Sequence, residues 1–155
     1  MNWIAVVTLA ITGIAIARVI LTVEDWQRDW TQNDASLTDD AADERLRPVI
    51  VPLPSALAGE AIIQWAELHP LWRLQSDSGA LETVSTLALI RTTRWMRFSD
   101  DVVVTLESVG DETTRVLATS QSRVGKGDLG QNPRNLRELT SMLRALSDSQ
   151  HESSE

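Results

Sequence analysis

The sequence predicts an α+β domain, a mostly antiparallel sheet with two helices on one face, preceded by an N-terminal single transmembrane helix. Two apolar patterns with helical spacing flank a series of strand-like segments. Short turns join those segments, and short turns connect antiparallel strands. The first 17 residues carry no charged side chain, which is typical of a membrane segment.

The N-terminal segment, residues 1–23, is the strongest signal in the chain. Its uncharged stretch would span about 24 Å as a helix, and extension to Val23 gives about 33 Å if Arg18 reaches outward to an interface. The pattern predicts a single-pass anchor whose partner is the lipid bilayer. A cleaved signal peptide ending at Ala15–Ala17 and a buried helix of a soluble protein stay open as alternatives.

The charged side chains are unevenly distributed along the 155 residues. Residues 1–44 hold two basic and eight acidic side chains, residues 45–144 hold twelve and eleven, and the remainder has three acidic ones only. We therefore predict an acidic tether over 24–47, the folded domain over 48–146, and a disordered acidic tail over 147–155. The chain has no cysteine, which excludes disulfide scaffolds, thiolate metal sites and thiol nucleophiles.

The domain's elements follow in the order β-α-β-β-β-β-α. Prolines bound an edge strand over 47–53, and Ser55 is a candidate N-cap for a helix that Pro70 ends. Four further strands are expected over 71–75, 81–92, 102–109 and 115–122, the last two joined in a hairpin by Gly110–Glu112. Asn132 is a candidate N-cap for the final helix, where leucines recur on one side.

Two polar segments stand out as candidate sites. The first, residues 91–100, carries Arg91, Arg94 and Arg97 beside two aromatic residues. One hypothesis is an amphipathic connector whose arginines pair with Asp100, Asp101 or solvent, and the other is a clamp for an anion or carboxylate.

The second segment, residues 122–134, contains a G-x-G-x-x-G pattern that follows a strand and precedes a helix. A dinucleotide fold requires a parallel strand after that helix, with an acidic residue about 20 positions on, and here a polar tail follows the helix, so no cofactor is predicted. In a purely structural interpretation, the glycines of this segment adopt positive φ and Asp128 bonds the backbone. In a functional interpretation, Arg123, Lys126 and Arg134 surround an anion site at the start of the helix.

The two segments together resemble domain-of-unknown-function family 1499. The resemblance covers about residues 48–146 and depends on Arg94, Met96, Phe98 and Asp100 and on the longer pattern Ser-Arg-x-Gly-x-x-Asp-Leu-Gly-x-Asn. It implies a site but no reaction. The chain lacks the cysteine-containing stretch of many relatives and looks closer to a membrane-anchored bacterial branch, which implies the inner membrane and favours a periplasmic domain, although Arg18 and Arg28 indicate the cytoplasmic side.

The hypothesis from sequence is a binding or assembly module on a bacterial membrane protein, with a membrane protein or a small anion as partner. An enzyme or carrier for an anionic or lipid-like molecule at the membrane surface is the alternative. No catalytic motif or metal-ligand spacing is visible, and neither metal nor nucleic acid is expected. The candidate binding residues are Arg94, Arg97, Asp100, Arg123, Gly125, Lys126, Asp128, Gly130, Asn132 and Arg134.

Overall fold

The computed structural model describes residues 3–22, 33–75, 86–94, 97–124 and 130–152. Three α-helices, six strands and one 3₁₀-helix lie within these ranges. In chain order they are α1 (Trp3–Thr22), β1 (Asp34–Ser36), η1 (Glu44–Leu46), β2 (Val49–Val51), α3 (Ser55–Leu68), β3 (Trp72–Leu74), β4 (Thr86–Thr92), β5 (Ser99–Gly110), β6 (Thr113–Ser122) and α4 (Gln131–Glu152). The predicted α+β class is confirmed.

The strands form one sheet in the order β1-β6-β5-β4-β3, with β2 also paired to β6. Every pairing within the described residues is antiparallel. The predicted hairpin is present as β5 and β6, which stay in register from Asp100 opposite Ser122 to Ser108 opposite Thr114, and the register shifts between Ser108 and Gly110 just before the turn. Residues 81–85 of one predicted strand lie outside the described residues, and β4 is described from Thr86.

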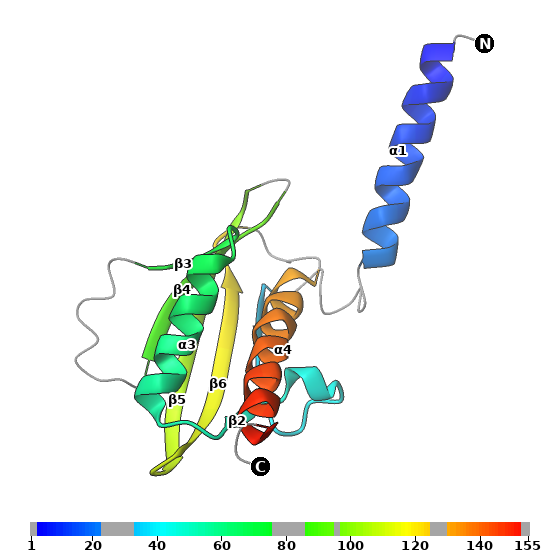
Figure 1. Ribbon diagram of the computed structural model, residues 1–155. Coiled ribbons are helices and arrows are strands. Elements are labelled where there is room, and N and C mark those ends of the chain that lie inside the picture. The colour runs from blue at the N-terminus through cyan, green and yellow to red at the C-terminus, as the bar shows by residue number, and fades with distance from the viewer. Residues whose placement is uncertain (1–2, 23–32, 76–85, 95–96, 125–129, 153–155) are drawn as a thin grey trace.

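Both α3 and α4 cover the same face of the sheet, as predicted (Figure 1). Helix α3 contacts β3 and β5, whereas α4 contacts β6 and the short strands β1 and β2. Alternation along β5 and β6 turns Val102, Val104 and Val116 toward the helices, where each is fully buried. At Gly59 a Cβ atom would lie 3.2 Å from Cδ1 of Leu106, so this glycine lets α3 lie close to the sheet.

The predicted acidic tether is wrong for its second half. Residues 34–36 pair with β6 as strand β1, and Leu37 after them is 95% buried in the core. Three polar or small residues carry no apolar alternation, so backbone pairing rather than a hydrophobic pattern places this strand.

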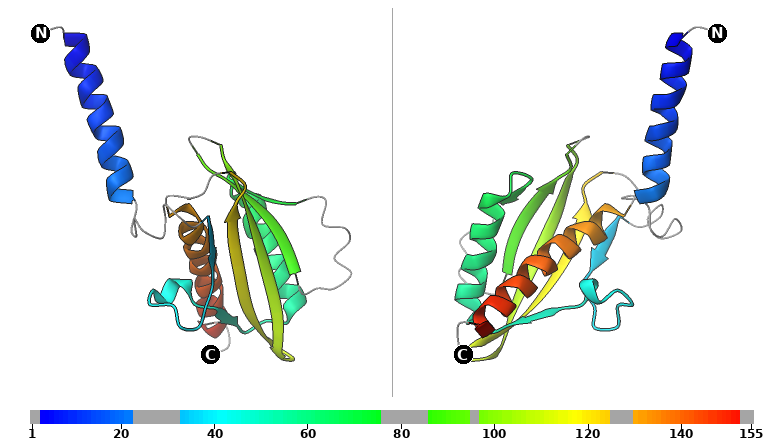
Figure 2. Two further views of the ribbon diagram at one scale, coloured as in Figure 1. Left: turned by 180° about the vertical axis from the view of Figure 1, so that it is seen from behind. Right: turned by 45° about the vertical axis from the view of Figure 1, so that its right-hand side comes forward.

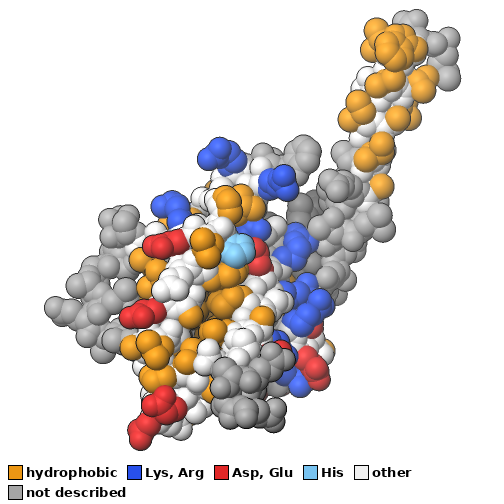
Figure 3. Space-filling view, viewed as in Figure 1, with side chains coloured by type: hydrophobic (Ala, Val, Ile, Leu, Met, Phe, Trp, Pro, Cys, Tyr) orange, Lys and Arg blue, Asp and Glu red, His pale blue; other side chains and the backbone are white. Residues whose placement is uncertain are grey.

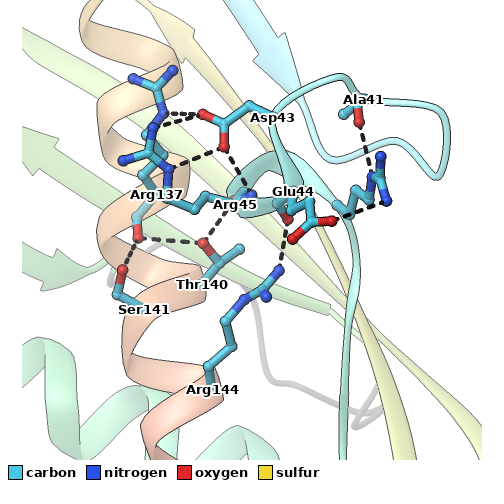
Figure 4. A network of polar contacts seen from close by, with 9 residues as sticks. Ala41, Asp43, Glu44, Arg45, Arg137, Thr140, Ser141 and Arg144 are labelled. Carbon is cyan, nitrogen blue, oxygen red and sulfur yellow. Dashed lines mark hydrogen bonds and ion pairs between the residues drawn. The ribbon is translucent and has the colours of Figure 1, made fainter.

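Ion pairs fasten the segment between β1 and β2 onto α4 (Figure 4). Asp43 accepts hydrogen bonds from Arg45 and, at 2.8 Å, from Nε of Arg137. Thr140 donates to the carbonyl of Arg45 and Arg144 to that of Glu44. The hydrogen bonds from Arg45, and after them the bond from Arg137, lower the pKa of Asp43 below its usual range, although partial burial opposes them.

The predicted disordered tail, residues 147–155, is helical up to Glu152. Helix α4 continues to Glu152, through a polar segment in which residues 148–150 are exposed, and residues 153–155 of the predicted tail lie outside the described residues. The helix begins at Gln131, one residue before the predicted cap, so Asn132 is an interior residue. Ser55 is likewise the first residue of α3, and Pro54 occupies the capping position.

The N-terminal segment forms α1, which stands apart from the α+β unit in two directions of view (Figure 2). Its described side chains are exposed, among them Trp3, Leu9 and Ile14. Within the described ranges, no helix has the length and apolarity needed to cross a membrane, so the predicted membrane-spanning helix is not found.

Candidate functional site

A row of polar side chains crosses the helix-covered face of the sheet at one end. Trp72 lies opposite Arg91, Arg91 opposite Asp100, and Asp100 opposite Ser122 in successive strand pairings. Cross-strand neighbours point to the same face, so these four residues, here called the polar row, all face the helices. The next row inward contains Leu89 and Val102, which belong to the core.

Helix α4 crosses this end and places a polar side chain over each of three positions in the row. Asn132, Asn135 and Glu138 recur every three residues and therefore share one side of the helix. Nδ2 of Asn132 donates to Oγ of Ser122 at 3.1 Å, Nδ2 of Asn135 donates to Asp100 at 2.8 Å, and Glu138 accepts from Arg91 at 3.3 Å.

The two residues of the row nearest β6, Asp100 and Ser122, form a closed cluster with three further polar residues of β6 and α4. Asp100, Ser120, Ser122, Asn132 and Asn135, the Asp100 cluster, are each at least 91% buried. Asp100 accepts from Ser122 at 2.7 Å as well as from Asn135, and Ser120 donates to Oδ1 of Asn132 at 2.6 Å. Because buried polar groups are costly without partners, these bonds fix α4 against β5 and β6.

The same cluster reaches the start of β1, since Asn132 donates to the carbonyl of Asn33 at 2.6 Å. Two predicted site residues, Asp100 and Asn132, both bond Ser122, and both are enclosed by other protein atoms. Their side chains hold four segments together and have no surface to offer a ligand.

Three members of the Asp100 cluster were missed in the sequence. A signal for them exists, because Ser120 and Ser122 share the alternating face of β6 with Val116 and Ala118. Asn135 likewise stands at helical spacing from Leu139. Polar residues at positions where a pattern demands apolar ones indicate a buried polar cluster.

The other half of the row, toward β3, is less completely bonded. Arg91 donates to the carbonyl of Thr92 at 2.7 Å and lies over the ring of Trp72, with 6.0 Å to the ring centroid. Its Nε atom and Nε1 of Trp72 are buried and have no hydrogen-bond partner among the described residues. Trp65 of α3 packs against Trp72, with ring centroids 4.9 Å apart.

A hollow of about 350 Å³ lies at the end of β3 and β4, outside the row. Arg73 from β3 and Arg94 and Arg97 from the turn after β4 line it, and none of the described residues that line it carries a carboxylate. These described lining residues, here called the arginine hollow, are Pro70, Leu71, Arg73, Thr92, Thr93, Arg94 and Arg97. Arg73 was missed in the sequence because it is twenty-one residues from Arg94 and carries no motif.

These three arginines differ from the other arginines whose side chains the structure describes. Each of the others bonds a carboxylate, a carbonyl or an amide, namely Arg45, Arg47, Arg91, Arg115, Arg123, Arg134, Arg137 and Arg144. The side chains of Arg73, Arg94 and Arg97 have no hydrogen bond or ion pair within the described part of the chain.

The turn that carries two of them is closed at its base. Thr93 N donates to the carbonyl of Phe98 at 2.8 Å, and Phe98 N donates to Oγ1 of Thr93 at 2.9 Å. Arg97 adopts φ of 53°, a left-handed conformation that side chains with a Cβ rarely take. The closed turn thus holds Arg97 in a strained conformation at the edge of the hollow.

Arg123, another predicted site residue, is engaged elsewhere. It bonds both carboxylate oxygens of Asp101, the shortest contact being 2.6 Å, and this hydrogen bond raises the pKa of its guanidinium. Arg134 lies on α4 beside Gln131. Neither is among the residues that line the arginine hollow.

Part of the glycine-containing segment lies outside the described residues, including Gly125, Lys126 and Asp128. Gly130 is described, is buried, and has φ of 75° immediately before α4. This left-handed conformation accounts for one of the three glycines by backbone geometry. Within the described ranges, no three acidic or histidine side chains come together to hold a metal ion.

Comparison with known proteins gives a family but no activity. The model of a family described as proteins of unknown function (DUF1499) matches residues 27–143, most of the α+β unit and the whole of both candidate segments. No curated protein and no solved structure matches the chain.

Proposed function

The chain belongs to the DUF1499 family of proteins of unknown function, and we propose that its α+β unit is a binding module that recognises an anionic group in the arginine hollow. The observation that carries the proposal is the convergence of Arg73, Arg94 and Arg97 on one hollow, where their side chains bond no other described residue. Guanidinium groups bind carboxylates and phosphates through paired hydrogen bonds, so three of them favour a ligand with several acceptor oxygens.

The surrounding structure supports a fixed rather than an adaptable site. Thr92 N donates to the carbonyl of Leu71 at 2.8 Å, which joins β3 to β4 beneath the hollow. Asp100 and Ser122 anchor the strand that follows the turn. Arg73 on a paired strand, and Arg94 and Arg97 in a turn that is closed at its base, lose less freedom when they bind than arginines on a free segment would.

Binding of inorganic phosphate and of acetate to the full-length chain, measured by isothermal titration at constant ionic strength, tests the proposal. We expect phosphate to bind more tightly than acetate, and the double substitution Arg94→Ala/Arg97→Ala to weaken phosphate binding by tenfold or more, since each lost charged hydrogen bond contributes roughly 1.5 kcal/mol.

A matched control removes the same charge from two arginines outside the hollow. Arg115 and Arg144 bond protein groups on other surfaces, so Arg115→Ala/Arg144→Ala is expected to leave phosphate binding unchanged. Equal weakening in both double variants would mean that net charge alone attracts the anion, and the proposal would fail.

Attachment to a lipid bilayer through residues 1–23 is a second part of the proposal. Its support is the exposure of apolar side chains along α1, of which Trp3 and Leu9 are each 76% exposed. Burial of such side chains in lipid is favourable by the hydrophobic effect.

Extraction tests the attachment. Expressed in bacteria, the full chain should stay with the membrane fraction after an alkaline wash, and Leu9→Asp/Ile14→Asp should release it. We place the module at the bacterial inner membrane on its periplasmic side, which a reporter fused after Glu155 and active only in the periplasm would test. Release of the unsubstituted chain by the wash would contradict attachment.

A further inference from the structure

We infer that two copies of this chain associate through the face of the sheet that α3 and α4 leave uncovered. Seen from behind, β4, β5 and β6 lie in front of both helices (Figure 2). Their residues that alternate with the core residues, such as Val102, Val104 and Val116, point away from the helices and form this surface, here called the open face. The inference goes beyond the proposed function, because no residue of the arginine hollow carries it.

At the centre of the open face, two neighbouring rows across the three strands carry no charged side chain. They are Ala88, Val103 and Thr119, and Thr86, Thr105 and Leu117. Val103 is 40% exposed although it is apolar, and a hollow of about 260 Å³ lies beside it, with Leu117 among the residues that line it. An exposed, uncharged and hollowed centre is typical of a surface that another protein covers.

A charged row beside this centre is complementary to itself. Glu107 of β5 lies opposite Arg115 of β6, with 3.4 Å between Oε2 and Nη1. When a two-fold axis runs along the sheet between β5 and β6, each residue of one strand faces its pairing partner in the second copy. Glu107 then faces Arg115 of the second copy at two symmetric places, and Thr105 faces Leu117. Opposite charges therefore meet beside an uncharged centre.

The charged row on the other side of the centre selects the direction of the axis. Asp101 is paired with Arg123 at 2.6 Å in its own copy and faces the uncharged Gln121 of the second copy, which is opposite it in the strand pairing. A two-fold axis across the strands would instead place Asp101 over Glu107 of the second copy. Because like charges repel, the charges favour the axis along β5 and β6.

The open face has the area that a stable dimer needs. The strands β4, β5, β6 and β1 are spaced by about 4.8 Å, so together they are about 19 Å wide, and residues 99–107 of β5 extend over about 30 Å. Two such faces in contact bury roughly 1,100 Å² in total, which reaches the size of a specific interface. Sheets packed face to face also keep their strands nearly aligned, as an axis along β5 and β6 requires.

Sedimentation equilibrium of the full chain in detergent micelles tests the inference. We expect the unsubstituted chain to be dimeric. Val103→Asp should weaken the dimer by roughly 100-fold or more, because each dimer then buries two carboxylates without partners. The matched control is Leu57→Asp, which places the same charge at an exposed apolar position of α3, on the helix side of the sheet, and should leave the dimer intact.

A charge exchange separates contacts between copies from contacts within one copy. Glu107→Arg and Arg115→Glu should each weaken self-association by about tenfold, because like charges then face each other across the axis. Mixed in equal amounts, the two variants should form a heterodimer as stable as the unsubstituted dimer, since each supplies the charge that the other lacks. The ion pair within one copy is lost in both variants, so it cannot produce this recovery.

A monomeric unsubstituted chain would overturn the inference. A dimer that persists in Val103→Asp would also overturn it, because another surface, such as α1, would then hold the copies together. Equal weakening by Leu57→Asp would show that added charge alone separates the copies. Mixed variants that stay monomeric would contradict the pairing of Glu107 with Arg115 across the axis.

Discussion

Two groups of polar residues lie side by side at one end of the sheet, and their bonding differs. In the Asp100 cluster every side chain is buried and bonded, whereas the three arginines of the arginine hollow are without protein partners in the described part of the chain. Asp100 and Arg97 are only three residues apart in the sequence. Proximity in a motif therefore does not assign a common role: the first group supports the fold, and we propose that the second binds a ligand.

Removal of the Asp100 carboxylate should have the largest effect on stability. Asp100→Ala leaves the hydroxyl of Ser122 and the amide of Asn135 buried without their acceptor, and we expect the free energy of unfolding to fall by about 3 kcal/mol. Urea denaturation measures it. The control is Asp101→Ala, next in the chain but paired with Arg123 at the surface, where a loss of about 0.5 kcal/mol is expected. Equal losses would break the comparison.

Asn132→Ala should destabilise somewhat less, by about 2 kcal/mol. Buried Ser120 loses its acceptor, and the half-buried carbonyl of Asn33 keeps the backbone N–H of Ser122 but loses its second donor, at the place where β1 joins the sheet. The exposed Gln121 of β6 provides the control, because Gln121→Ala should stay within about 0.5 kcal/mol. A mild effect of Asn132→Ala would indicate that the cluster is not needed to hold β1.

Acid should weaken a third polar group, the Asp43 network. The pKa of Asp43 is lower in the folded protein than its ordinary value of 3.8, so its stabilisation is complete above that value and is lost as the pH falls toward the folded pKa. Asp43→Asn should cost about 1 kcal/mol at neutral pH, and its difference from the unsubstituted chain should shrink below about pH 4. Thermal melting at a series of pH values measures both. A constant difference down to pH 2 would contradict the assignment.

Substitutions in the arginine hollow should have the smallest effect on folding. Arg97→Gly removes a side chain from a left-handed position, so we expect stability to change by no more than about 0.5 kcal/mol or to rise slightly. Gly130→Ala imposes the opposite change at φ of 75° and should cost about 1 kcal/mol. Denaturant unfolding compares the two. A large loss in Arg97→Gly would place that arginine in the fold instead of at a binding surface.

The sequence predicts those parts of the fold that repeat a pattern. The alternation along β5 and β6 and the turn after Gly110 predict the hairpin, and leucines at helical spacing predict α4. Strand β1 has no such pattern, because three residues paired through their backbones need no apolar alternation. The end of α4 was predicted as disordered because its polar composition is also that of a tail.

The candidate site was predicted in part, for similar reasons. Motif residues identified both Asp100 and Arg94, but the sequence could not say that one is buried and the other exposed. Burial depends on α4 lying over β5, which is a tertiary contact. Arg73 joins the arginine hollow only because β3 pairs with β4, and no local pattern carries that information.

The central claim is that the arginine hollow binds an anion while contributing little to folding. Melting temperatures of the full chain and of Arg94→Ala/Arg97→Ala, measured at increasing phosphate and constant ionic strength, test both halves together. We predict equal melting temperatures without phosphate and a rise with phosphate in the unsubstituted chain alone. Equal rises in the two proteins, or a double variant that melts well below the unsubstituted chain before phosphate is added, would contradict the claim.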